Sequence, residues 1–176
     1  MERRAGGEDR GDPEENQGGV GVVEGAAGTV VLDTDVLIDY LRGVRDAIAF
    51  VEGLRREGVE LATTAINIFE LAWGACKIGE AKLRDIYKLS RALRVLSLSE
   101  REALKAGEEM GYLESLGVPV DLRDVLVGVA ARENGASVAT GNVRHFRRIR
   151  GLAVIEYRRR QGALSARSSR QGVRLP

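Results

Sequence analysis

The sequence has 176 residues, which suits one domain with a substantial core and is too short for two ordinary domains. A single cysteine and a single histidine exclude an intrachain disulfide, a thiolate zinc site and a histidine-rich metal site, so any metal would be bound by oxygen. Because no apolar run of about 18 residues occurs and the N-terminus lacks the apolar stretch of a signal peptide, we expect a soluble cytoplasmic protein with no membrane segment.

The formal net charge of +1 conceals an uneven distribution along the chain. Residues 1–28 carry three arginines and seven acids, whereas residues 158–176 carry six arginines and no acid. The first segment is an acidic, glycine-rich head and the second a basic tail, and neither has a hydrophobic period. We predict that both are disordered. The expected folded domain is therefore residues 29–157.

Within this domain, short apolar or β-branched runs alternate with segments of helical period. The expected strands cover residues 29–33, 59–63, 95–98, 137–140 and 152–157. The expected helices are one through residues 36–41 that stops at Gly43, one through residues 47–54 that ends at Gly58, and helices over residues 65–78, 82–93, 99–116, 121–134 and 143–149. This alternation predicts an α/β fold, with a mainly parallel sheet and helices on both of its faces.

Ligands of parallel sheets bind beyond the carboxyl ends of the strands, and the first strand ends at a polar group. Asp33 closes that strand and is followed by Thr34 and Asp35. A helix N-cap, worth about 1 kcal/mol, needs only one such side chain. Capping and a functional role therefore both remain open for this group.

Glu70 is the second candidate, because it lies inside a helix on the same stripe as Ile66 and Trp73. A carboxylate among apolar side chains is costly unless a cation or a hydrogen-bond donor meets it. The alternative is that Glu70 lies at the edge of the stripe and reaches water.

Two more polar segments lie near ends of predicted elements. Asp121 and Asp124 open an apolar helix, and as its N-cap and N3 residues they have a sufficient local explanation. Thr140 and Asn142 follow a later strand, where a polar turn is the usual structure.

The parallel sheet is expected to bring these four segments to one edge. Acids that converge there without a lysine or arginine between them would repel one another, unless a hard divalent cation neutralises them. Oxygen ligands suit Mg²⁺ or Mn²⁺. Such a site can polarise a phosphodiester and activate a water molecule for attack.

Four segments resemble, in order and spacing, PIN-domain ribonucleases, and most closely the VapC-type toxins of toxin–antitoxin modules. The segments are VVLDTDVLID at 30–39, ATTAINIFELAWG at 62–74, VDLRDVLVGVAA at 120–131 and VATGNVRHF at 138–146. The resemblance covers about residues 29–157. It implies a three-layer α/β/α sandwich that cleaves RNA with one or two Mg²⁺ or Mn²⁺ ions, with Asp33, Glu70 and Asp124 matching the first three acids of the family.

At the fourth acidic position the sequence departs from the strictest family pattern. Asn142 stands there, and His145 occupies a place often taken by Asp, so we expect weaker or single-metal binding. The expected mechanism is in-line attack on RNA by a metal-activated water. Thr34, Asn142, Thr140 and Asp121 are the expected orienting groups, the last through a water molecule.

The expected RNA contacts are Arg144, Arg147, Arg148 and Arg150, which follow Asn142 closely and could hold the phosphate backbone. Solvated surface charge is the alternative. The resemblance further implies a homodimer and a small antitoxin whose peptide covers the acidic cleft, with an arginine entering it. Apolar residues between 71 and 93 exceed what one core face needs, so either a partner or a neighbouring helix could cover them.

Three other functions remain open. The first strand is also similar to that of haloacid dehalogenase-like phosphatases, but Leu37 stands where these enzymes expect Thr or Val, and no lysine closely precedes Asp121. A catalytically inactive RNA-binding or dimerisation module is the second alternative, supported by the missing fourth acid. The third is a PIN nuclease that processes RNA without an antitoxin.

Overall fold

The computed structural model describes residues 28–158, so the predictions for residues 1–27 and 159–176 lie outside the described residues. All the predicted strands and helices occur, although the last helix is shorter than the predicted 143–149. The strands are β1 (Thr29–Leu32), β2 (Glu60–Thr64), β3 (Arg94–Leu96), β4 (Ser137–Thr140) and β5 (Val154–Glu156). The helices are α1 (Thr34–Leu41), α2 (Arg45–Arg56), α3 (Ala65–Cys76), α4 (Glu80–Ala92), α5 (Glu100–Ser115), α6 (Leu122–Glu133) and α7 (Val143–Phe146).

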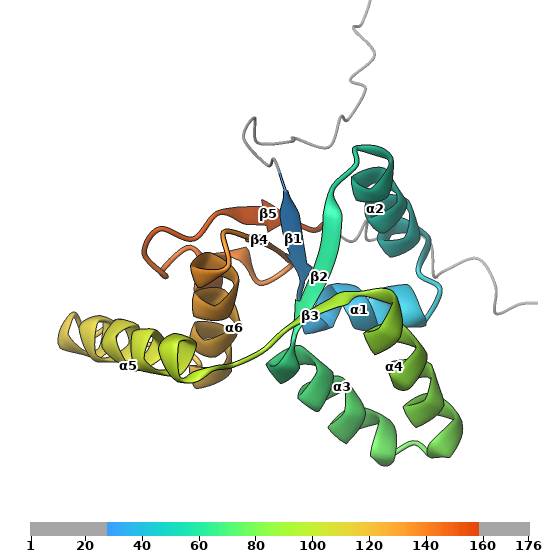
Figure 1. Ribbon diagram of the computed structural model, residues 1–176, viewed down its shortest axis with the longest axis horizontal. Coiled ribbons are helices and arrows are strands. Elements are labelled where there is room, and N and C mark those ends of the chain that lie inside the picture. Colours follow the sequence, from blue (N-terminus) through green and yellow to red (C-terminus); the bar gives the residue numbers. More distant parts are fainter. Residues whose placement is uncertain (1–27, 159–176) are drawn as a thin grey trace, which may run out of the picture.

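The strands form one sheet in the order β3-β2-β1-β4-β5, and every pairing is parallel (Figure 1). β1 occupies the centre, where Val31 pairs with Ala62 of β2 on one side and with Val138 of β4 on the other. The predicted mainly parallel sheet is confirmed, and among the described strands it is entirely parallel.

Helices cover both faces of the sheet, so the three-layer α/β/α architecture is confirmed (Figure 1). Successive side chains of a strand point to opposite faces. Val30 and Leu32 of β1 accordingly pack in a core beneath α1 to α4, while Val31 packs in a second core beneath α5, α6 and α7. Each of these three side chains is at most 1% exposed. The sheet is therefore held in place by a core on each face, and it positions the polar residues at its carboxyl edge.

The order of the strands places a switch point between β1 and β4. From β1 the chain continues to β2 on one side of the sheet, and only later returns to β4 on the other side. Loops that leave the carboxyl ends of such strands diverge and leave room for a ligand. The backbone N–H of Asp33 donates to the carbonyl of Ala139 at 3.0 Å, which fixes the ends of β1 and β4 next to each other. None of the helices in residues 28–158 is long and apolar enough to cross a membrane.

Candidate functional site

Asp33 is the centre of the polar network at the carboxyl edge of the sheet. It is the N-cap of α1, one of the two roles left open for this group, and its Oδ1 accepts from the backbone N–H of Thr34 at 2.7 Å. The same oxygen accepts from Asn67 Nδ2 at 3.0 Å, and Oδ2 accepts from Thr140 Oγ1 at 2.7 Å. A cap alone would need only the first of these bonds. With 9% of its surface exposed, Asp33 is a carboxylate that three segments hold in one orientation.

The pKa of Asp33 is raised to about 6, mainly by burial and also by the negative charges of Asp35 and Asp124, against the lowering effects of the hydrogen bonds from Thr140 and the backbone N–H of Thr34. The pKa of Asp35 is also raised, first of all by burial, although the backbone N–H of Gly141 donates to its Oδ2 at 2.8 Å. The edge of the sheet therefore carries negative charge that its own hydrogen-bond donors do not balance.

Glu70 lies across from Asp33 and is connected to it by hydroxyl and amide groups. Thr34 Oγ1 donates to Glu70 Oε2 at 2.6 Å and accepts from Asn67 Nδ2 at 2.9 Å. A hydrogen-bond donor thus meets Glu70, as a carboxylate among apolar side chains would require. The apolar stripe invoked for it is not confirmed, because Trp73 is 56% exposed and the buried residues of α3 are Asn67, Leu71 and Ala75.

Asp124 completes the predicted set of three acids. Its Oδ2 accepts from Asn142 Nδ2 at 3.3 Å and lies 2.9 Å from His145 Nδ1. The backbone N–H of Asn142 donates to Thr140 Oγ1 at 2.9 Å, which links this group to Asp33 through the threonine hydroxyl. The hydrogen bonds thus form one continuous network from Glu70 to Asp124.

Arg123 contradicts the expectation that the acids meet without a basic residue between them. Its Nη1 donates to Glu70 Oε1 at 2.7 Å, and its Nε and Nη2 each donate to Asp121 at 3.1 Å. Asp121 also caps α6 through the backbone N–H of Arg123 at 2.8 Å. Arg123 and Asp124 are neighbours in the sequence, but consecutive residues of a helix point in different directions. The sequence alone therefore does not show that the side chain of Arg123 turns toward Glu70. Asp121 thus binds an arginine, where we expected it to orient the site through water.

The donor chemistry of the site fits a hard divalent cation, since the predicted ligands are carboxylate oxygens with a surplus of negative charge. The side-chain arrangement fits less completely. Among residues 28–158, no group of three or more acidic, histidine or cysteine side chains lies in a geometry ready to ligate a metal. The carboxylate of Glu70 is engaged by Arg123 and Thr34 instead.

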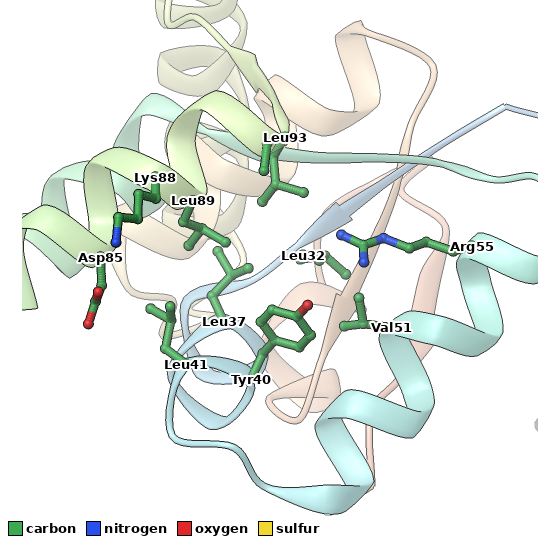
Figure 2. A pocket seen from close by; sticks show the side chains of 11 residues that line it. Leu32, Leu37, Tyr40, Leu41, Val51, Arg55, Asp85, Lys88, Leu89 and Leu93 are labelled. Carbon is green, nitrogen blue, oxygen red and sulfur yellow. The ribbon is translucent and has the colours of Figure 1, made fainter.

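An open hollow of about 440 Å³ adjoins the network and is lined by Asp35, Asp39, Gly141, Asn142 and Tyr157. A second cavity of about 440 Å³ lies away from the predicted site, between α1, α2 and α4 (Figure 2). Leu37, Val51 and Leu89 line this second cavity together with Arg55 and Lys88. None of the predicted site residues lines it, so it forms no part of the acidic site.

One polar residue of the site, Asn67, escaped the sequence analysis, and so did the contact made by a second, Asp35. Asn67 is fully buried and forms a capping box with Thr64 at the start of α3, while its amide bridges Asp33 and Thr34. Its signal in the sequence was an asparagine three residues after a threonine at a helix start. Asp35 was noted as part of the first polar group, but its bond to Gly141 depends on the pairing of β1 with β4.

The arginines after Asn142 separate into two groups. Arg144 and Arg147 are exposed, whereas Arg148 donates to the backbone carbonyl of Pro119. Arg150 is bonded to the buried carboxylate of Glu109 through its backbone N–H at 3.0 Å and through its guanidinium. Arg150 therefore stabilises the fold, and Arg144 and Arg147 are the arginines most accessible to a ligand.

The fold and the site together define the class of protein: a parallel α/β/α domain with a carboxylate network at the switch point of its sheet. The PIN domain model matches residues 30–152, and the chain belongs to the PIN domain family. It is 32% identical to Ribonuclease VapC10 of Mycobacterium tuberculosis, over 66% of this chain and 85% of that protein. It is 26% identical to the tRNA(fMet)-specific endonuclease VapC of Salmonella typhimurium, over 72% of this chain and 96% of that protein.

Solved structures show the same fold. VapBC-1 from nontypeable Haemophilus influenzae matches with a TM-score of 0.65 and 27% identity, over 73% of this chain and 98% of that chain. VapBC2 from Rickettsia felis, bound to a DNA fragment from its promoter, matches with a TM-score of 0.64 and 22% identity, over 74% and 99%. The second likeness is one of fold alone.

Asp33→Asn is expected to stabilise the metal-free protein at neutral pH. With a pKa of about 6 in the folded state against 3.8 for the ordinary group, the folded protein holds the proton more tightly, so stability falls as pH rises from about 4 to about 6. Asparagine carries no charge to bury. In EDTA at pH 7.5, urea unfolding should give a free energy higher for Asp33→Asn by on the order of 2 kcal/mol, and the difference should vanish near pH 4. A variant less stable than wild type at pH 7.5 would contradict this.

Proposed function

We propose that the chain is a metal-dependent endoribonuclease that acts as the toxin of a toxin–antitoxin pair. The observation that carries the proposal is the continuous network from Glu70 through Asp33 to Asp124 at the switch point of a PIN-domain sheet. The names of the curated relatives, a ribonuclease and a tRNA endonuclease, support the same activity.

The divalent cation, Mg²⁺ or Mn²⁺, would be held by Asp33, Asp124 and Glu70, and when bound it would polarise the phosphodiester and lower the pKa of an attacking water. The protein's own groups do the positioning. Thr140 holds Asp33 by its hydroxyl, and Asn142 holds Asp124 by its amide. Both contacts keep the carboxylates in place before the substrate arrives, which lowers the reorganisation needed during the reaction.

RNA is proposed to lie along the hollow beside Asn142. Arg144 and Arg147 follow it on α7 and the next residues, and both are exposed. Guanidinium groups bind phosphate oxygens through charge-assisted hydrogen bonds without regard to base sequence. These two arginines are therefore expected to contribute affinity for the backbone, with Arg148 beside them.

Removing residues 158–176 is expected to flatten the salt dependence of RNA binding. The deletion removes six arginines, and each phosphate contact to single-stranded RNA contributes a slope of about −0.7 in the logarithmic plot of affinity against salt. Full-length protein with those arginines changed to glutamine is the matched control, and it should show the same flatter slope. A slope unchanged by either modification would exclude the tail from RNA binding.

A protein partner is proposed from the surface that α3 and α4 present. Its exposed apolar side chains are Phe69, Trp73, Ile78 and Tyr87, and the first two stack with their ring centres 6.1 Å apart. Apolar exposure of this kind marks interaction surfaces. Several solved neighbours are described as toxin–antitoxin complexes, so a small antitoxin and a second copy of this chain are the proposed occupants.

Stabilisation by Mn²⁺ distinguishes a metal-dependent enzyme from a catalytically inactive RNA-binding or dimerisation module. A catalytic site is expected to bind Mn²⁺ and raise the melting temperature of the wild-type protein, and Asp33→Asn should abolish that rise. One observation favours the inactive module, because the guanidinium of Arg123 already neutralises the carboxylate of Glu70. An equal rise in both proteins, or none in either, would contradict the proposed metal site. Transient phosphorylation of Asp33 would instead support a phosphatase.

A further inference from the structure

The carboxylate of Glu70 has both oxygens engaged by groups of this chain. Oε1 accepts from Arg123 Nη1 at 2.7 Å, and Oε2 accepts from Thr34 Oγ1 at 2.6 Å. The side chain of Glu70 is 17% exposed, whereas that of Arg123 is 55% exposed. A mostly buried acid is thus neutralised by a cation that reaches it from the surface, and any other cation that approaches Oε1 meets the positive charge of this guanidinium.

Arg123 is anchored at this position by a second acid. Its Nε and Nη2 donate to the two oxygens of Asp121, each at 3.1 Å, while the backbone N–H of Arg123 donates to the same side chain. The planar guanidinium suits such a two-point contact. Because Asp121 takes Nε and Nη2, the bond from Nη1 to Glu70 can break while the guanidinium stays at the N-terminus of α6.

The other two predicted ligands are surrounded differently. Among the described residues, the hydrogen bonds to Asp33 come from a backbone amide, Asn67 and Thr140, and those to Asp124 from Asn142 and His145. None of these donors is a lysine or an arginine. Within residues 28–158, Glu70 is therefore the predicted ligand that carries an arginine counter-charge.

We infer that Arg123 is an internal counter-cation that competes with the divalent metal for Glu70 and so weakens metal binding. The inference rests on the proposed function, since it takes Glu70 to be a metal ligand. Metal binding exchanges one hydrogen bond, from Arg123 Nη1 to Glu70 Oε1, for ligation by the cation. Arg123 is a positioning residue in this account, because it acts on the site through Glu70.

The test is the dissociation constant for Mn²⁺, measured by the electron paramagnetic resonance of free Mn²⁺ on the full chain without RNA. Arg123→Ala and Arg123→Gln should each bind Mn²⁺ about threefold to tenfold more tightly than wild type, the range expected when an ion pair with one exposed partner is removed. Arg42→Ala is the charge-matched control, because Arg42 is exposed and lines, together with Glu70, a pocket of about 200 Å³ between α1, α3 and α4. It should change the constant by less than about twofold.

A double-mutant comparison assigns the effect to Glu70. In the Glu70→Gln background, removing Arg123 should leave the Mn²⁺ constant unchanged within about twofold, since there is no carboxylate left to release. Three results would overturn the inference while leaving the proposed function intact. Arg123→Ala could bind Mn²⁺ no more tightly than wild type, or Arg42→Ala could tighten Mn²⁺ binding as much as Arg123→Ala does. The removal of Arg123 could also tighten Mn²⁺ binding fully in the Glu70→Gln background. Absence of Asp33-dependent Mn²⁺ binding from both wild type and Arg123→Ala would overturn the inference and the metal site together.

Discussion

Replacing Asp124 with asparagine is expected to lower the rate of RNA cleavage by about a hundredfold or more, the usual cost of removing a group that stabilises charge at a reacting centre. Asparagine has nearly the same shape, so the contacts at 3.3 Å with Asn142 and at 2.9 Å with His145 can be kept after a rotation of the amide. What is lost is the negative charge that a divalent cation needs.

The measurement is a single-turnover cleavage rate on a defined RNA in Mg²⁺ and in Mn²⁺. Glu114→Gln is the matched control, because it makes the same chemical change on the exposed surface of α5, and its rate should stay within about twofold of wild type. Thermal unfolding of both variants should show an intact fold. A wild-type cleavage rate in Asp124→Asn would show that this carboxylate is not part of the catalytic site.

Glu109→Ala is expected to cost about 2–4 kcal/mol of stability, a large part of the 5–15 kcal/mol typical of a domain. The side chain of Glu109 is 1% exposed and binds both Arg132 and Arg150, so it fastens α5 to α6 and to the segment after α7. Burial raises the pKa of Glu109, but the hydrogen bonds from Arg150 and Arg132 lower it below its ordinary value, and the carboxylate stays ionised. Alanine would remove this carboxylate from both arginines, of which Arg132 keeps its ion pair with Glu133.

Urea unfolding measures this loss against a neighbouring control. Glu108→Ala removes an exposed acid that pairs with Lys105 at 2.7 Å, and it should change the free energy of unfolding by less than about 0.5 kcal/mol. The loss of stability expected for Glu109→Ala is smaller than that for a fully buried ion pair, because the side chain of Arg150 is 52% exposed and its guanidinium can regain contact with water. Equal effects of the two substitutions would show that the buried network contributes nothing beyond surface charge.

Elements and their order follow from local patterns in this sequence. The buried run at β1 and the helix predicted to begin at residue 99 each depend on residues close in the chain, and the structure confirms both. Helix α5 follows Ser99, which forms a capping box with Glu102. The carboxyl edge could also be predicted, because parallel strands bring their ends together whatever their exact register. This is why four polar segments far apart in sequence could be placed at one edge, whereas the choice of Asp33, Glu70 and Asp124 among their residues came from the resemblance to PIN-domain ribonucleases.

The direction of individual side chains could not be predicted in the same way. Arg123 had no predicted role, and its reach to Glu70 depends on how α6 packs against α3. Trp73 appeared to belong to the core, yet it lies on the exposed side of α3. Glu109 also had no predicted role, and its burial depends on Arg132 and Arg150, which come from other segments. Long-range packing decides each of these positions, and helical periodicity alone does not encode it.

The account rests most directly on whether this chain cleaves RNA internally and needs a divalent cation to do so. The decisive measurement follows the full-length protein acting on an RNA with both ends blocked, in Mn²⁺, in EDTA, and in EDTA followed by excess Mn²⁺. We predict internal cleavage in Mn²⁺, none in EDTA and recovery when the ion is restored. Cleavage that persists at the same rate in EDTA, or no cleavage under any of these conditions, would contradict the assignment of a metal-dependent endoribonuclease.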